Sequence, residues 1–216
     1  MIPNTSDNKL PKSELTKLRI IESFLKLIKK KRWDKLSVKE ICAASNITRT
    51  TFYQYYEDIF DVMEKIQQKH LNALEKLSEN CCLPAKSAQI SSLDEFESRF
   101  NIASALDRAW YTYCAEYRPD FLALCHPTNG DDYFRIKLKT LWCTYINLSM
   151  DQDGFPKDSF RNHFLDLMFN NFFQSMYSWI STDNGERLSI DQLCDMQNAW
   201  RIGSAYLRMK ENPIKN

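Results

Sequence analysis

The chain has 216 residues, of which 44% are hydrophobic and 26% charged, and its formal net charge is +1. These proportions are typical of a folded globular protein and exclude wholesale disorder. No apolar run reaches the roughly 18 to 20 residues that span a bilayer, and residues 1–15 lack the apolar stretch of a secretory signal. We therefore expect neither a membrane span nor export.

Glycine and cysteine usage narrow the fold classes further. Only four glycines occur, and the first is Gly130. All-β folds, phosphate-binding loops and dinucleotide folds need glycine at special backbone angles, so this scarcity disfavours all three. The seven cysteines are odd in number and include no C-x-x-C, so reduced thiols that fill the core are expected. The adjacent Cys81 and Cys82 also fit a redox or soft-metal sensor, although the sequence places no third ligand; no metal site is predicted.

Charge is distributed unevenly along the chain. Residues 1–70 hold 14 Lys and Arg against 9 Asp and Glu, a net +5, whereas residues 71–216 carry a net −4. A basic N-terminal third suggests that this end meets a polyanion. Its densest run, 29–32, ends a predicted helix. A solvated last turn and direct phosphate contact both fit that run.

The N-terminal region predicts a unit of three helices over residues 13–60. Apolar residues recur every three or four positions from 15 to 28, which predicts the first helix. Ser37 and Glu40 have the spacing of a capping box, in which the hydroxyl accepts from the backbone N–H three residues on and the carboxylate reaches back. We therefore expect a second, short helix over about 38–44.

A tight turn follows this second helix. Asn46 suits the left-handed conformation that ends a helix, because asparagine adopts it more readily than other residues with a side chain. Thr48 can then cap a third helix over 49–55. Two helices joined by the three-residue turn 45–47 form a helix-turn-helix candidate. Its small core is expected to come from Ile41, Ala44, Ile47 and Phe52.

Helical periodicity continues beyond this unit. A fourth helix over 58–79 connects it to the rest of the chain. Residues 80–92 and 151–156 are predicted loops because they contain proline together with serine or glycine, and Pro119 is expected to break a helix. Further helices are predicted at about 93–117, 131–148, 159–180 and 189–209. The chain is therefore expected to be all-α, with about nine helices.

Residues 41–56 read ICAASNITRTTFYQYY. The small residue before the turn, Thr-Phe-Tyr, one residue and then two aromatic residues closely resemble the helix-turn-helix sequence of the TetR family of bacterial transcriptional regulators. Trp33 and Asp58 match the flanking positions of that family. Two positions differ from its usual pattern: Asn46 stands where glycine is common, and Ile59 stands where a phosphate-contacting lysine often sits.

The resemblance covers residues 15–65 and implies a domain organisation for the chain. It implies a disordered arm over 1–12, a helix-turn-helix DNA-binding domain over 13–60, a connecting helix over 58–79, and a C-terminal effector-binding and dimerisation domain over 80–212. It also implies a regulator in the bacterial cytoplasm, associated with the nucleoid, that binds an operator in double-stranded DNA. No cofactor is expected.

In the family, the third helix lies in the major groove of DNA. Carried over to this chain, the resemblance places Arg49 and Gln54 nearest base edges, where they suit guanine and adenine respectively. Ser37 and Lys39 begin the second helix, whose N–H groups and dipole favour a phosphate. The implied DNA-binding residues are Ser37, Lys39, Thr48, Arg49, Thr50, Thr51, Tyr53, Gln54 and Tyr55.

The C-terminal helices are implied to provide dimerisation and effector binding. Because one reading head covers only a few base pairs, a homodimer on a pseudo-palindromic operator is expected. The residues assigned to its interface are Phe164, Met168, Phe172, Met176, Trp179, Leu193, Met196, Trp200 and Leu207. A small apolar or aromatic effector would occupy the middle helices and release the repressor. The residues assigned to that pocket are Phe100, Trp110, Tyr113, Tyr117, Trp142, Tyr145 and Phe169.

Other functions fit the sequence less well. The same fold could be controlled by a protein partner or act as an activator, and the sequence leaves both open. An enzyme is disfavoured, because the three histidines, His70, His126 and His163, lie far apart and no catalytic motif or metal-ligand spacing accompanies them. A purely structural helical scaffold would leave the Thr-Phe-Tyr pattern and the basic N-terminal third unexplained.

Overall fold

The computed structural model describes residues 11–81, 93–152, 156–182 and 185–211, with backbone alone for 93–104, 152 and 204–211. Within these ranges all the regular structure is helical, which confirms the all-α prediction. The elements are α1 (Lys12–Ile28), the 3-10 turn η1 (Trp33–Lys35), α2 (Val38–Ser45), α3 (Arg49–Tyr53), α4 (Ile59–Cys81), α5 (Leu93–Glu116), α6 (Arg118–Leu124), α7 (Asp132–Gln152), α8 (Ser159–Ser181) and α9 (Ile190–Glu211). None of the described helices is both long and apolar enough to cross a membrane.

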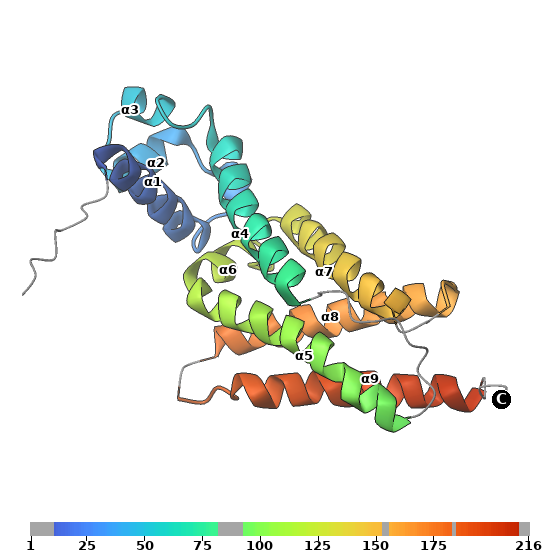
Figure 1. The fold of residues 1–216 in the computed structure, drawn as a ribbon. Coiled ribbons are helices and arrows are strands. Elements are labelled where there is room, and N and C mark those ends of the chain that lie inside the picture. The colour runs from blue at the N-terminus through green and yellow to red at the C-terminus, as the bar shows by residue number, and fades with distance from the viewer. Residues whose placement is uncertain (1–10, 82–92, 153–155, 183–184, 212–216) are drawn as a thin grey trace, which may run out of the picture.

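The chain forms two lobes that the long helix α4 joins (Figure 1). Helices α1, α2 and α3 form the N-terminal lobe, and α4 leaves it to pack against α5 and α7 of the C-terminal lobe. Helix α1 also packs against α6, and the N–H of Trp33 donates to the carbonyl of Asn129 over 3.1 Å. Apart from α4, the N-terminal lobe is therefore held to the C-terminal lobe by the contact of α1 with α6 and by this hydrogen bond.

Helix α4 is bonded to the C-terminal lobe by buried polar side chains. His70 is fully buried, with Nδ1 2.9 Å from the Tyr113 hydroxyl of α5 and Nε2 3.0 Å from Asp120 Oδ2 of α6. One turn earlier, Nε2 of the buried Gln67 donates to Asp131 over 2.6 Å. Since these bonds are directional, they fix the rotation of α4 about its axis as well as its position.

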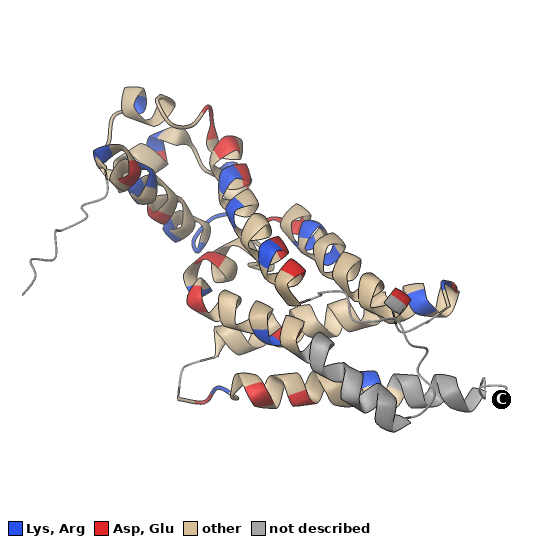
Figure 2. Cartoon of the chain, in the orientation of Figure 1, with Lys and Arg blue, Asp and Glu red and all other residues tan. Residues whose placement is uncertain are grey.

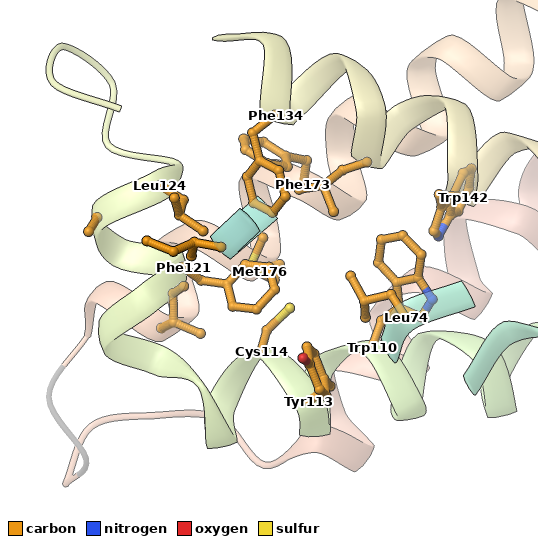
Figure 3. Packing of buried hydrophobic residues seen from close by; sticks show 14 of the residues in the cluster. Leu74, Trp110, Tyr113, Cys114, Phe121, Leu124, Phe134, Trp142, Phe173 and Met176 are labelled. Carbon is orange, nitrogen blue, oxygen red and sulfur yellow. The ribbon is translucent and has the colours of Figure 1, made fainter. Parts of the chain in front are cut away.

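The core of the C-terminal lobe is largely aromatic. Trp110, Trp142 and Phe172 are buried together, and the Trp142 ring is stacked on Phe172 with centroids 5.8 Å apart. Figure 3 shows Trp110 and Trp142 at one end of this core and Phe121 and Phe134 at the other. Aromatic pairs in such arrangements add roughly 0.5–1.5 kcal/mol each beyond their buried area.

Several element boundaries differ from the sequence expectations. Helix α3 ends at Tyr53 rather than at residue 55. Pro119 does not end a helix but lies in the first turn of α6, where its missing N–H has no consequence. The structure exposes Ala44, so its assignment to the core is wrong. The neighbouring Ser45 is buried instead, and its hydroxyl donates to the carbonyl of Ile41 over 2.7 Å.

The described cysteines are free thiols and support the prediction that they act mainly as core residues. Three are buried and three are half-buried, and burial raises the pKa of Cys114 well above its ordinary value. The proposed pair of Cys81 and Cys82 falls partly outside the described residues, as does the predicted loop at 80–92.

Candidate nucleic-acid interface

The start of α2 is held by a complete capping box. The Ser37 hydroxyl accepts from the N–H of Glu40 over 3.3 Å, and the N–H of Ser37 donates to Glu40 Oε2 over 2.8 Å. Lys31 donates to the other oxygen of Glu40 over 2.9 Å. The bonds from Lys31 and Ser37 together lower the pKa of Glu40 to about 2. This end of α2 therefore keeps its geometry wherever the carboxylate is ionised.

The turn between α2 and α3 depends on Asn46. It has φ 52° and ψ 52°, and it is the one described residue other than glycine with a positive φ. The N–H of Ile47 then donates to the carbonyl of Cys42 over 3.0 Å, which closes the end of α2. The left-handed residue predicted from the sequence is confirmed, and it sets the direction in which α3 leaves the turn.

Helix α3 is capped at its start and anchored by one face. The Thr48 side chain accepts from the N–H of Thr51 over 3.1 Å, as expected for an N-cap. Phe52 is fully buried, with its ring centroid 5.8 Å from that of the buried Tyr56. Burial is the main cause that raises the pKa of Tyr56 to about 12. These contacts leave the opposite face of α3 to solvent.

The exposed face of α3 presents one cation and several hydrogen-bonding groups. Arg49, Thr50, Tyr53 and Gln54 are exposed, with 56% of Tyr53 accessible. Lys39 is exposed at the start of α2. Within the described residues, neither Lys39 nor Arg49 is in an ion pair. Figure 2 shows α3 at the tip of the N-terminal lobe, with little charge along it. An exposed guanidinium that is in no ion pair among the described residues is available for a planar acceptor such as a guanine edge or a phosphate.

Two predicted contact residues, Thr51 and Tyr55, are half-buried. Tyr55 packs against the core, and the Lys17 ammonium lies 5.9 Å from its ring centroid. Lys65 of α4 donates to the carbonyl of Tyr55 over 3.1 Å and to Asp61 over 2.9 Å. The sequence analysis missed Lys65, which ties the segment that follows α3 to α4.

The basic run after α1 and the start of α4 contribute less charge than their sequence suggests. Lys31 pairs with Glu40 and Arg32 pairs with Asp34, so two of the four cations in 29–32 are already neutralised. Ile59 is 8% exposed and lies in the core. The side chain at that position therefore cannot serve as a phosphate contact.

The predicted pocket residues lie close together in the C-terminal lobe. Trp110, Trp142 and Phe169 are buried, and the Trp142 and Phe169 centroids are 6.0 Å apart. Tyr113 and Tyr145 are also buried, and Tyr117 is half-buried with its centroid 4.6 Å from that of Tyr113. The side chain of Phe100 lies outside the described residues.

The structure corrects the prediction for most of the dimer-interface residues. Five of them pack inside the single chain. Helices α5, α6 and α7 cover α8, and α9 packs on α5. These five are Met168, Phe172, Met176, Trp179 and Leu193. Phe164 is half-buried, while Met196 and Trp200 are exposed by 54% and 58%. The side chain of Leu207 is not described.

Comparison with known proteins gives a consistent result for the fold. No family model matches the chain, and no curated protein matches it. A TetR-like transcriptional regulator from Rhodococcus sp. RHA1 covers 91% of this chain and 99% of its own, with 14% identity and a TM-score of 0.61. The fatty acid degradation regulator FadR from Bacillus halodurans covers 87% and 95%, with 15% identity and a TM-score of 0.58. The transcriptional regulator FadR from Bacillus subtilis, solved with stearoyl-CoA, covers 83% and 94%, with 13% identity and a TM-score of 0.55.

The fold is that of TetR-type regulators. The likeness covers most of both chains in each comparison, so it includes the C-terminal lobe as well as the helix-turn-helix. The expectation drawn from residues 41–56 is thereby confirmed for the fold of the described residues. At this level of identity the comparison concerns architecture, and the roles of individual residues have to be argued from the site itself.

Proposed function

We propose that the chain is a sequence-specific DNA-binding regulator of transcription, in which the exposed face of α3 reads the major groove. The observation that carries this proposal is the arrangement of α2 and α3: both helices are capped, a left-handed turn joins them, and Phe52 anchors α3 so that Arg49, Thr50 and Gln54 face outward. A short helix fixed by one face and exposing an unpaired guanidinium suits a base edge.

The protein acts as a homodimer on a pseudo-palindromic operator. A good base contact discriminates by about 1–3 kcal/mol, whereas useful operator specificity needs about 4–10 kcal/mol. The five residues of α3 offer too few contacts to supply this alone, so two copies are needed. Exposed apolar residues support an interface on α8 and α9, namely Leu167 with 65% of its surface accessible together with Met196 and Trp200.

The C-terminal lobe binds a small apolar or aromatic effector that releases the operator, so the regulator is a repressor. The Bacillus subtilis regulator, whose fold is similar, was solved in complex with stearoyl-CoA, a ligand with a long apolar acyl chain. The aromatic core around Trp110, Trp142 and Phe169 provides comparable apolar surroundings in this chain. Such a regulator would work in the bacterial cytoplasm, on the nucleoid.

Selection of bound duplexes from a random DNA library at moderate salt tests the proposal. The expected result is an enriched inverted repeat whose affinity falls steeply with salt, because bound phosphates displace counterions. Arg49→Ala should flatten the preference at one base pair in each half-site. Arg108→Ala removes an exposed arginine of the C-terminal lobe and should leave the preference unchanged. A folded, dimeric protein that enriches no duplex would contradict the proposal.

A further inference from the structure

The middle of α9, residues 196–203, has polar side chains on its inner face and apolar ones on its outer face. Gln197 and Arg201 are buried and bond to α5, whereas Met196 and Trp200, which precede them in the sequence, are exposed. A surface helix normally buries its apolar residues and exposes its polar ones. This segment does the reverse and leaves its apolar side exposed in a single chain.

The outer face of this segment is a stripe of uncharged residues. Met196, Ala199, Trp200 and Gly203 follow one another at helical spacing, and all four are exposed. A Cβ added at Gly203 would meet no described atom within 4 Å, so the described chain leaves this end of the stripe uncovered. The cores of interfaces between proteins are poor in charged residues and rich in methionine and aromatic residues. The stripe therefore has the composition of an interface and fits the second copy that the proposed homodimer requires.

Two hydrogen bonds join the inner face of the segment to α5. Arg201 Nη2 donates to Asp107 Oδ2 over 2.5 Å, and both side chains are buried. Gln197 Nε2, one turn earlier on α9, donates to the hydroxyl of the buried Tyr111 over 3.2 Å. Asp107 and Tyr111 are also one turn apart on α5. Two directional bonds spaced along the contact fix the rotation of α9 about its axis.

The strength of these bonds does not by itself explain why they are present. Taking a carboxylate and a guanidinium out of water costs about as much as their attraction returns, and an apolar pair of similar size is often as stable or more stable. Apolar contacts, however, have no preferred direction. What the polar pairs add to the contact between α5 and α9 is a single orientation of the helix.

The alternative orientation would bury the stripe within the chain. Successive residues of a helix differ by about 100° around its axis, so a turn by one position would bring Met196 and Trp200 onto α5 in place of Gln197 and Arg201. Burial of two large apolar side chains is favourable, so an α9 without polar partners on α5 would turn its stripe inward. The polar pairs prevent this, because the same turn would break both bonds.

We propose that Asp107 and Tyr111 are positioning residues for self-association. Through Arg201 and Gln197 they hold α9 with its apolar stripe turned outward, where a second copy of the chain covers it. The inference rests on the homodimer of the proposed function and adds how its interface is kept accessible. A chain that lacks these bonds stays folded, turns the stripe toward α5 and dimerises weakly.

Two paired substitutions in the full chain test this inference. Asp107→Val with Arg201→Met replaces the ion pair by apolar side chains of similar combined size, and Tyr111→Phe with Gln197→Met removes the second bond with little change of shape. Sedimentation velocity over a dilution series gives the dimer dissociation constant, and circular dichroism at the same concentrations gives the helix content. Each variant should keep the helix content of the parent and weaken the dimer, by at least about tenfold for the ion pair.

The surface pair of Arg108 and Asp191 provides the matched control, because it joins the same two helices where both side chains are exposed. Arg108→Met with Asp191→Asn should change the dimer dissociation constant by less than about twofold. If one of the two test variants unfolds, the other decides. Folded variants that dimerise as tightly as the parent would overturn the inference, as would loss of the helical signal in both, because the pairs would then hold the lobe together. A parent chain that stays monomeric throughout the series would contradict the homodimer and the inference with it, which distinguishes the two failures.

Discussion

Replacing His70 by phenylalanine should destabilise the protein by about 2–4 kcal/mol. The change removes two hydrogen bonds, each worth about 0.5–1.5 kcal/mol. It also leaves the hydroxyl of Tyr113, a residue that is only 9% exposed, without the partner that His70 provides. The phenyl ring retains the contacts of the imidazole with Tyr117 and Phe121, so little packing is lost. For a chain of this size, 1 kcal/mol corresponds to about 2–4 °C in Tm, which predicts a loss of about 4–16 °C.

A double-mutant cycle with Tyr113→Phe separates the hydrogen bond from general packing. If His70 and Tyr113 interact as the 2.9 Å distance indicates, the double variant should be less destabilised than the sum of the single variants by at least 0.5 kcal/mol, on the order of measured couplings. Chemical denaturation of each variant gives the four free energies of unfolding. Additivity within about 0.3 kcal/mol would refute the assignment of this bond as a link between α4 and α5.

Three further predictions concern the N-terminal lobe. Asn46→Ala should cost about 1–2 kcal/mol in the free energy of unfolding, because φ is 52° there, while Asn46→Gly should be nearly neutral; equal melting temperatures for both would be unexpected. Glu40 should titrate near pH 2 by NMR and at a clearly higher pH in Lys31→Ala, because the bond from Lys31 is the largest cause of the lowered pKa; the contribution of Glu40 to stability is present above about pH 4.5 and is lost as the pH falls through about 2. Arg49→Ala should reduce the discrimination at its base pair by about 1–3 kcal/mol per half-site in competition binding, and an unchanged base preference would rule out direct reading by Arg49.

Local features of the N-terminal lobe were predictable because the residues that determine each of them are only a few positions apart in the sequence. Ser37 and Glu40 are three positions apart, and the conformation of Asn46 follows from its own side chain and its place after a helix. Ala44 was predicted wrongly, since small size fits both a close helix contact and an exposed position. The structure uses Ser45 as the buried residue of that turn instead.

Features that depend on distant parts of the chain were not predictable from periodicity. The apolar spacing of Met168, Phe172 and Met176 shows that they are buried but not which surface covers them, so an interface and an intrachain core gave the same pattern. Asp107 and Arg201 are 94 positions apart, and nothing local marks either as a buried ion pair. A polar residue on an otherwise apolar helix face is the one signal that could have identified them.

The position of α5 suggests a route by which the proposed effector would act on the N-terminal lobe. Over two turns this helix carries Asp107, Trp110 and Tyr113, and the last two bond to Ser78 and His70 of α4. Under the proposed function, a ligand that displaced α5 would therefore act on α4 through two buried hydrogen bonds, together worth about 1–3 kcal/mol. Coupling free energies between allosteric sites are typically about 1–3 kcal/mol, so these two bonds are of the right size to transmit the signal. Because α4 begins inside the N-terminal core and its Lys65 holds the carbonyl of Tyr55, two residues after α3, a rotation of α4 would reorient the face that carries Arg49.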